Sequence, residues 1–331
     1  MDEVVVVPPS TFLHGRRTSW ASAPPAIAAW VEATLDAPVA DWHDRVGGMS
    51  IGIASVVTTA TGISRFVKAV NGTENPFALE LAVRETELAS RLPLLPHTPR
   101  ILDAGSVTTS EGDRWWVMTT PAAGGLAVGH PWQPTDLSRV LRDWEDVAVV
   151  LRQTAWESTS RPAPFFTAWS ALAADRADPW QPLVTSWLDR EARLLELVGG
   201  SEHDPAVLSH LDLRADNILV DSSGDRVWFV DWAHAGLAAR WVDYALLLAD
   251  VVGSGSDVST GGPIDVLSVW RSHPITGQYD PELLICVIAG LAAALHLLAR
   301  RPTDLLLPHR SRWSAAMAAQ MVPFVRQHTV R

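Results

Sequence analysis

Residues 209–217 read Ser-His-Leu-Asp-Leu-Arg-Ala-Asp-Asn, and they lead directly into the apolar residues Ile-Leu-Val. Within this stretch, His210, Asp212 and Asn217 form the pattern His-x-Asp-x-x-x-x-Asn. The apolar residues that follow predict a short strand at 217–220. A second strand candidate, 226–231, ends in an acid. A polar loop followed by two short strands of this kind is much more specific than the loop pattern alone.

These residue types suit phosphoryl transfer. The reaction needs a carboxylate that orients the attacking hydroxyl and takes its proton, and hard oxygen ligands that hold Mg²⁺ against the phosphates of a nucleotide. Asp212 fits the first task, because its carboxylate lies in the middle of the loop. Asn217 and Asp231 fit the second, since a hairpin between the two strands would bring both to one ion. His210 is then expected to hold the loop.

A lysine provides the second signal. Lys68, within Phe-Val-Lys-Ala-Val at 66–70, is the only lysine among the 26 Lys and Arg residues of the chain. A solvent-facing strand lysine is the ordinary interpretation of such a position. However, a chain that uses arginine everywhere else has kept one compact ammonium, which suits a site between phosphates and a carboxylate. The expected partner is Glu85 on the following helix, with Glu80 and Glu87 as alternatives.

A glycine-containing turn, Gly-Gly-Met-Ser-Ile-Gly at 47–52, precedes the Lys68 strand. Glycines allow the backbone to approach a phosphate, so Gly48, Ser50 and Gly52 are candidates for nucleotide binding. The same turn is also compatible with a plain hairpin. It matches neither a Walker A loop nor G-x-G-x-x-G, which argues against a P-loop NTPase or a Rossmann dehydrogenase.

The first part of the chain, 1–118, is predicted to form a small lobe with a five-stranded sheet. Short β-branched segments separated by turns give the strand candidates 41–46, 53–59, 65–70, 100–107 and 115–119. Helices are predicted at 25–35 and 77–92, the second packed on the sheet. The residues Pro-Ala-Ala-Gly-Gly then break the pattern, so 119–125 is predicted to be a hinge linker.

The remainder, 126–331, is predicted to be mainly helical. The expected helices are 136–157, 180–198, 241–251, 281–300 and 312–327. The catalytic loop, 208–217, and the metal-binding hairpin, 217–231, lie between them. The prediction is therefore an α+β protein with a small antiparallel-sheet lobe and a large helical lobe.

Bulk properties limit the partners. The net charge is −11 over 331 residues, which disfavours nucleic acid and anionic membranes as partners. The single cysteine, Cys286, fits a buried position in a reducing cytoplasm, and no signal peptide is evident. The apolar run 283–299 approaches the length of a membrane span, but its Asp-Pro-Glu start is typical of a soluble core helix.

The chain resembles the aminoglycoside phosphotransferase family, relatives of protein kinases that include choline and homoserine kinases. The resemblance extends over about 44–243, and Leu211 replaces the glycine that the family usually has between the histidine and the aspartate. It implies a bilobal protein-kinase-like fold, ATP or GTP as phosphate donor, and Mg²⁺. It also implies Asp212 as base, Asn217 and Asp231 as metal ligands, Lys68 with Glu85 as the phosphate-binding pair, and Asp243 as a brace for the loop.

Two further predictions follow from the resemblance. Some protein kinases have a basic residue two positions after the catalytic aspartate, so Arg214 is expected to stabilise the charge being transferred. Adenine is expected to be held by backbone groups near Met118, Thr119 and Thr120, where Pro121 lacks an N–H group for a hydrogen bond.

The acceptor is expected to be a hydroxylated natural product or metabolite, aminoglycoside-like or macrolide-like among others. Trp169, Trp180, Trp270 and Trp313 can stack on a sugar or be core residues. Two alternatives remain at this point. One is a nucleotide-binding pseudokinase scaffold, and the other is a protein kinase, although no Ala-Pro-Glu segment follows Asp231.

Overall fold

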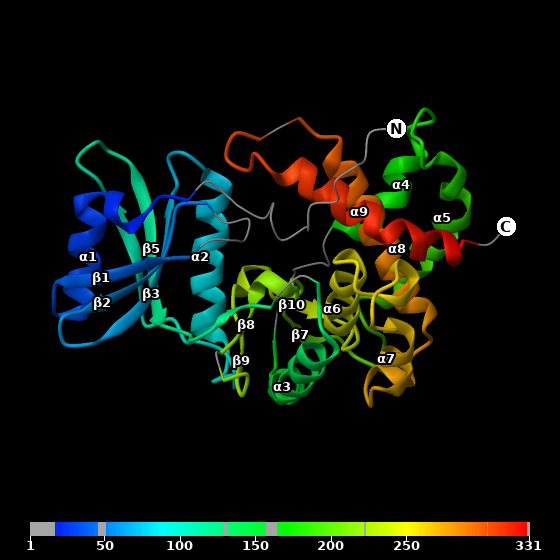
Figure 1. The fold of residues 1–331 in the computed structure, drawn as a ribbon, viewed down its shortest axis with the longest axis horizontal. Helices are drawn as coiled ribbons and strands as arrows, with labels where there is room; N and C mark the ends of the chain where they lie inside the picture. Colours follow the sequence, from blue (N-terminus) through cyan, green and yellow to red (C-terminus); the bar gives the residue numbers. More distant parts are fainter. Residues whose placement is uncertain are drawn as a thin grey trace.

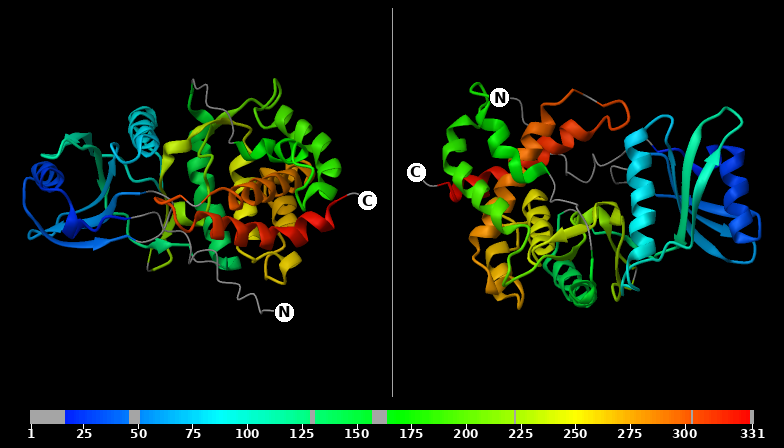
Figure 2. Two further views of the ribbon diagram at one scale, coloured as in Figure 1. Left: turned by 90° about the horizontal axis from the view of Figure 1, so that it is seen from above. Right: turned by 180° about the vertical axis from the view of Figure 1, so that it is seen from behind.

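The computed structural model describes residues 17–45, 51–128, 131–156, 164–221, 223–302 and 304–329, and its two lobes are seen in Figure 1. Gly48 and Ser50 of the predicted glycine-containing turn lie outside these residues. Figure 2 shows from two further directions that the lobes lie side by side along the longest axis. The predicted α+β architecture with two lobes is confirmed.

The small lobe is built on an antiparallel sheet with the strand order β1-β2-β3-β5-β4. The strands are β1 (Val39–Asp44), β2 (Ile53–Thr59), β3 (Ser64–Asn71), β4 (Asp103–Thr108) and β5 (Arg114–Pro121). Helices α1 (Pro25–Leu35) and α2 (Pro76–Arg91) lie on opposite faces of this sheet (Figure 1). Ile27 and Val31 of α1 pack on Val57, Val67 and neighbouring core residues of the sheet.

Helix α2 begins where the sequence supplies both a cap and a proline. The Asn75 side chain accepts a hydrogen bond from the N–H of Ala78, and Pro76 occupies the first turn, where its missing N–H costs nothing. The helix packs against β3, β5 and the short turn Trp232–His234 of the large lobe. It therefore spans the boundary between the lobes.

Pro121 belongs to β5, so the hinge linker begins later than predicted. Its Cα pairs with that of Arg65 at the end of the β3–β5 ladder. A proline is tolerated at the end of a ladder because it has no N–H to leave unpaired there. The chain enters the large lobe through β6 (Leu126–Ala127), which pairs with β8 (Ile218–Val220).

Short strands frame the predicted catalytic loop. Strand β8 pairs with β9 (Val227–Phe229), and β7 (Val207–Ser209) pairs with β10 (Gly236–Ala238). The pair β7–β10 was not predicted, because strands of three residues show no periodicity that can be recognised in a sequence. The loop therefore starts at the end of one strand and finishes at the start of another.

Helices fill the rest of the large lobe. Their bounds are α3 (Pro134–Gln153), α4 (Ala168–Ala173), α5 (Gln181–Leu197), α6 (Val242–Gly253), α7 (Val266–Ser272), α8 (Glu282–Ala299) and α9 (Arg310–Gln327). The short helices α4 and α7 were not predicted. Helix α8 is long and apolar enough to cross a membrane, and 56% of it is buried in the large lobe. It packs against α4, α5, α6 and α9, as expected for a core helix.

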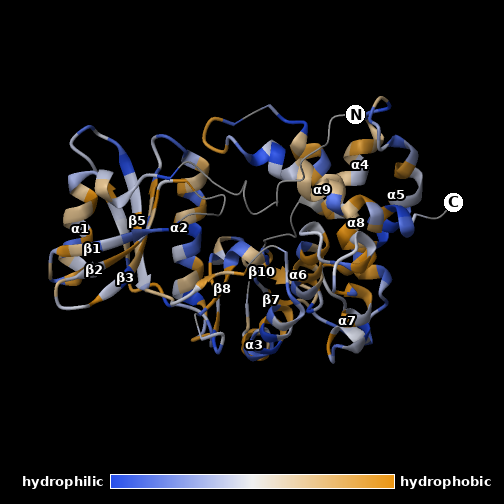
Figure 3. Ribbon diagram, viewed as in Figure 1, coloured by the Kyte–Doolittle hydropathy of each residue, from blue (hydrophilic) through white to orange (hydrophobic). Residues whose placement is uncertain are grey.

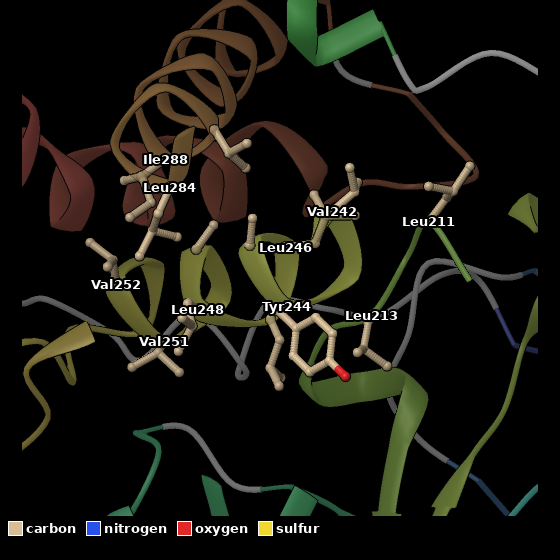
Figure 4. Packing of buried hydrophobic residues seen from close by; sticks show 14 of the residues in the cluster. Leu211, Leu213, Val242, Tyr244, Leu246, Leu248, Val251, Val252, Leu284 and Ile288 are labelled. Atoms are coloured by element: carbon tan, nitrogen blue, oxygen red, sulfur yellow. The ribbon is translucent and has the colours of Figure 1, made fainter. Parts of the chain in front are cut away.

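Hydrophobic residues are concentrated in the helices at the centre of this lobe (Figure 3). Every residue of α6 is buried. The same apolar cluster extends to the predicted catalytic loop through Leu211 and Leu213, which Figure 4 draws together with residues of α6 and α8. The loop is therefore anchored to the apolar core of the large lobe.

Candidate active site

A cavity of about 1180 Å³ lies between the two lobes. Lys68, Glu85 and Met118 line it from the small lobe. The large lobe contributes a second set of lining residues, Asp212, Arg214, Asn217 and Asp231. Polar groups that are distant in the sequence thus converge in one cleft, as is usual for ligand sites.

Lys68 connects the lobes. Its Nζ lies 2.7 Å from Oε2 of Glu85 and 3.2 Å from Oδ1 of Asp231, and only 12% of its side chain is exposed. The rivals of Glu85 on α2, Glu80 and Glu87, do not form this contact, because Glu85 is the one that faces the cavity. The solvent-facing interpretation of Lys68 does not hold in this structure.

The charges in this cluster stabilise one another. Burial alone would lower the pKa of Lys68, but the nearby carboxylates of Asp231 and Glu85 raise it above the ordinary value. Burial also disfavours ionised Asp231, yet the ammonium of Lys68 holds the pKa of that carboxyl below its usual range. The site therefore keeps one ammonium and one carboxylate charged side by side.

The loop 210–217 is held by hydrogen bonds to its own side chains. Asn217 Nδ2 donates to Oδ2 of Asp212 at 2.8 Å and to the Asp212 carbonyl at 2.9 Å. The Val230 N–H donates to the Asn217 carbonyl at 3.0 Å, which sets Asn217 beside the residue that precedes Asp231. Burial raises the pKa of the Asp212 carboxyl above its usual range.

His210 stands behind the loop and not in the cavity. The Asp212 N–H donates to His210 Nδ1 at 3.3 Å, so Nε2 carries the proton that is shared with the Val230 carbonyl at 3.0 Å. Burial lowers the pKa of His210, which favours this neutral imidazole. Asp243 accepts the N–H groups of His210 and Leu211, each at 2.8 Å.

Leu211 adopts a backbone conformation that favours glycine. Its φ is 62°, in the left-handed region. The side chain is 7% exposed and belongs to the core cluster of the large lobe. Burial of the leucine side chain therefore offsets the cost of the backbone conformation, which explains how this residue can replace a glycine at the position.

Arg214 is engaged by two acids of its own loop. Its Nη2 lies 2.6 Å from Oδ2 of Asp216, and its Nε lies 3.5 Å from Oδ1 of Asp212. Both Arg214 and Asp216 line the cavity. Asp216 was missed in the sequence, although an acid directly before Asn217 in a loop of this kind was a usable signal.

The predicted adenine-binding segment forms the end of β5. Met118 and Thr120 line the cavity, but the side chain of Thr119 lies on the opposite face of the strand. Thr119 Oγ1 donates to Asp103 at 3.1 Å, and its carbonyl accepts the Leu102 N–H at 2.8 Å. The alternation of a strand thus turns the Thr119 side chain away from the cavity, and the expected contact of this segment with adenine through backbone groups stays a prediction.

Gly52 is not among the residues that line the cavity. Its φ is +91°, and a Cβ there would lie 2.2 Å from the Ala69 carbonyl oxygen. Its own carbonyl accepts the Thr18 N–H at 2.9 Å. The glycine is therefore required by close packing against β3, and the prediction that it faces a phosphate is not supported by this geometry.

Some lining residues were not predicted. Arg17 reaches the cavity from the segment that forms a bridge with Gly52. Arg310, Trp313 and Ser314 line it from the first turns of α9. Among the four tryptophans considered for stacking, Trp313 alone is in the lining, whereas Trp169 and Trp270 are buried in the core.

Comparisons with known proteins identify the family of this chain. The model of the phosphotransferase enzyme family APH matches residues 55–263. A comparison with curated protein sequences finds no match.

The fold is similar to that of several solved kinases. A thermostable mutant of aminoglycoside phosphotransferase APH(4)-Ia is 15% identical, with a TM-score of 0.59 over 92% of this chain and 100% of that one. Aminoglycoside 2'-phosphotransferase-IIIa is 12% identical, with a TM-score of 0.58 over 89% and 97% of the two chains. Choline kinase LicA from Streptococcus pneumoniae is 15% identical, with a TM-score of 0.54 over 88% and 96%.

The family match covers more than half of the sequence and includes both Lys68 and the loop 210–217. The chain therefore belongs to the phosphotransferase enzyme family APH, and its fold is similar to that of small-molecule kinases.

Proposed function

We propose that this protein transfers the γ-phosphate of a nucleoside triphosphate to a hydroxyl group of a natural product or metabolite, with Asp212 as the base. The observation that carries the proposal is the convergence of Lys68 and Asp231, whose Nζ and Oδ1 atoms lie 3.2 Å apart although the residues are 163 positions apart in the sequence. The same cavity contains Asp212 and Asn217.

In the proposed reaction, Asp212 takes the proton of the acceptor hydroxyl. The hydroxyl oxygen forms a bond to the γ-phosphorus as the bond from this phosphorus to the β,γ-bridging oxygen breaks, and the nucleoside diphosphate leaves. Lys68 neutralises the α- and β-phosphates, and Glu85 holds the ammonium in place. Arg214 lies at the same edge of the cavity, where its charge reduces repulsion of the transferring group.

The residues present fit a magnesium ion. Asn217 uses its Nδ2 for Asp212, which leaves its amide oxygen available as a metal ligand in the cavity that Asp231 also lines. No group of three or more His, Cys, Asp or Glu side chains that could hold a metal occurs in the described part of the chain. Two protein ligands are sufficient for Mg²⁺, because the nucleotide phosphates and water complete its octahedral shell. When bound, the ion neutralises charge that develops on the phosphate oxygens.

ATP is the proposed donor, with GTP as the alternative. The APH(4)-Ia mutant was solved in a ternary complex with AMP-PNP and hygromycin B, and the 2'-phosphotransferase-IIIa structure is a GDP complex. Met118 and Thr120 line the part of the cavity where the adenine or guanine ring of the nucleotide is expected.

The geometry disfavours the two other candidates. A pseudokinase typically lacks at least one catalytic group, whereas Lys68, Asp212, Asn217 and Asp231 are all present and close together. A protein kinase needs an activation segment, but only one short turn and β10 lie between Asp231 and α6.

The test is release of ADP or GDP with a panel of hydroxylated acceptors, in wild type and in Asp212→Asn. We expect the substitution to lower kcat by about 10² to 10⁴-fold, as for loss of a general base. Asp225→Asn is the matched control, because Asp225 is an exposed acid on the β8–β9 turn. Equal turnover in wild type and Asp212→Asn would disprove the proposed base.

A magnesium titration tests the ligands separately. Asn217→Ala and Asp231→Asn are expected to raise the Mg²⁺ concentration needed for half-maximal turnover. Unchanged magnesium dependence in both variants would remove these residues from the metal site.

A further inference from the structure

Three polar groups on one turn of α9 lack a hydrogen-bond partner among the described residues, and they belong to residues that line the active-site cavity. Arg310 Nε, Trp313 Nε1 and Ser314 Oγ are buried, and none has a partner within the described parts of the chain. All three residues line the cavity. They lie three and four positions apart, so they share one face of the helix.

Burial makes these groups informative. Ser314 is 0% exposed and Trp313 is 5% exposed. A buried donor without a partner costs free energy comparable to a lost hydrogen bond, so such groups are rare and call for an explanation. A ligand in the cavity that accepts hydrogen bonds from this turn would supply one.

The turn lies next to the proposed reaction centre. The guanidinium of Arg214 is 5.5 Å from the centre of the Trp313 ring. Arg214 is in turn 3.5 Å from the carboxylate of Asp212. A molecule that contacts Trp313 is therefore within reach of the base, which places this turn on the acceptor side of the cavity.

The chemistry of the turn specifies what it binds. Arginine and the indole N–H are donors only, and a serine hydroxyl can donate or accept. Leu298, Leu307 and the Trp313 ring add apolar surface to the same wall. The wall therefore suits oxygen atoms that accept hydrogen bonds, attached to a partly apolar molecule.

An ammonium group would meet mainly hydrogen-bond donors there. It donates three hydrogen bonds and accepts none, so it would face the donors of Arg310 and Trp313. Three carboxylates that line the cavity already contact cations: Asp216 and Asp212 contact Arg214 at 2.6 and 3.5 Å, and Asp231 contacts Lys68 at 3.2 Å. The guanidinium of Arg310 would also repel an ammonium group. One of its nitrogens, Nη1, contacts Asp304 at 3.5 Å.

We propose that Arg310, Trp313 and Ser314 form the acceptor-binding wall, and that the acceptor is a hydroxylated compound presenting a carboxylate or carbonyl oxygen to this wall, not an ammonium-rich aminoglycoside. The inference rests on the proposed function and specifies its substrate class.

The test compares acceptors that differ in one group. Glucosamine, N-acetylglucosamine and glucuronate share sugar hydroxyls but carry an ammonium, a carbonyl or a carboxylate. Pantothenate and kanamycin extend the carboxylate-bearing and ammonium-rich classes. We expect Asp212-dependent release of ADP with carbonyl- or carboxylate-bearing probes, at a kcat/KM at least about tenfold above that of the ammonium-bearing ones, as for one charge-assisted hydrogen bond.

Two conservative variants test the wall itself. Ser314→Ala and Trp313→Phe each remove one donor, so we expect each to raise the acceptor KM about three- to tenfold and to leave the KM for ATP unchanged. Ser311→Ala and Trp187→Phe are the matched controls, because they make the same chemical changes at residues that do not line the cavity. Neither control should alter the acceptor KM.

The outcomes separate the two proposals. Better turnover of the ammonium-bearing probes, no turnover of any oxygen-accepting probe, or an unchanged acceptor KM in both wall variants would overturn the inference. Absence of ATP binding by calorimetry, or turnover that is independent of Asp212, would instead overturn the proposed function.

Discussion

Leu211 offers a stability test, because the usual order of stability, in which an alanine variant is more stable than a glycine variant, should not hold at this position. At most positions glycine is less stable than alanine by about 0.5–1 kcal/mol, because it loses more backbone freedom on folding. Leu211 has φ 62°, where a residue with a Cβ is disfavoured by about 1–2 kcal/mol. Glycine escapes this cost, so Leu211→Gly should be as stable as Leu211→Ala or more stable.

Leu213 is the matched reference. It is 0% exposed, belongs to the same apolar cluster and does not have a positive φ. Truncation to alanine at either position should cost about 2–5 kcal/mol through lost burial and the remaining cavity. Further truncation from alanine to glycine should cost about 0.5–1 kcal/mol more at Leu213 only. The difference between the two Ala→Gly effects should therefore be about 1–2 kcal/mol.

The free energy of unfolding of the alanine and glycine variants at Leu211 and at Leu213 is measured in urea by circular dichroism. The difference between alanine and glycine is then taken at each position. Both variants of a position lack the leucine side chain, so the cost of losing it cancels. An Ala→Gly effect of the same sign and size at both positions would refute the explanation of Leu211. Activity provides a second measurement, because Asp243 holds the backbone N–H groups of His210 and Leu211 and not their side chains. Leu211→Gly should then keep a kcat within a few-fold of Leu211→Ala.

Four further predictions follow from the site and the core. Lys68→Met should lower kcat by about a hundredfold or more, because it removes the charge placed against the phosphates; turnover close to wild type would contradict the proposed role. Asp243→Ala should lower the free energy of unfolding by about 3 kcal/mol in urea titrations, since two buried N–H groups at 2.8 Å lose their acceptor; a loss below that of Asp225→Ala would show that Asp243 is no brace. Burial raises the pKa of Cys286 to about 12, so Ellman's reagent at pH 8 should label the protein only after unfolding, and rapid labelling of the native protein would place the thiol at the surface. Because burial raises the pKa of Asp212 and a base must be unprotonated, the acid limb of kcat/KM should lie above the ordinary range for aspartate; a rate that stays constant down to pH 4 would argue against this carboxylate as base.

Local patterns accounted for much of the architecture. Helix α1 has the predicted bounds, and α2 differs from its prediction by one residue at each end, because capping residues and periodic apolar positions mark such helices. The strands around Lys68 were also anticipated from β-branched segments between turns. Strands β7 and β10 and helices α4 and α7 were missed, since elements of three to seven residues are stabilised by their neighbours more than by their own sequence.

Two sets of predicted site residues face directions that only the structure reveals. Gly52 was expected to approach a phosphate, but its missing Cβ makes room for the Ala69 carbonyl. Thr119 was grouped with Met118 and Thr120 for its backbone groups, and strand alternation points its side chain to the other face. In both cases the residue type was informative, while the direction in which it faces depended on strand pairing.

The sequence by itself determined which chemical groups are available and in what order they occur. Asp212 and Asn217 lie five positions apart in one loop, so local spacing was enough to predict that they act together. Tertiary structure alone decided that Glu85, and not Glu80 or Glu87, meets Lys68, and that the first turns of α9 line the cavity between the lobes. The physical reason is that these contacts join segments far apart in the chain, and their geometry is set by the packing of α2 and α9 against distant elements.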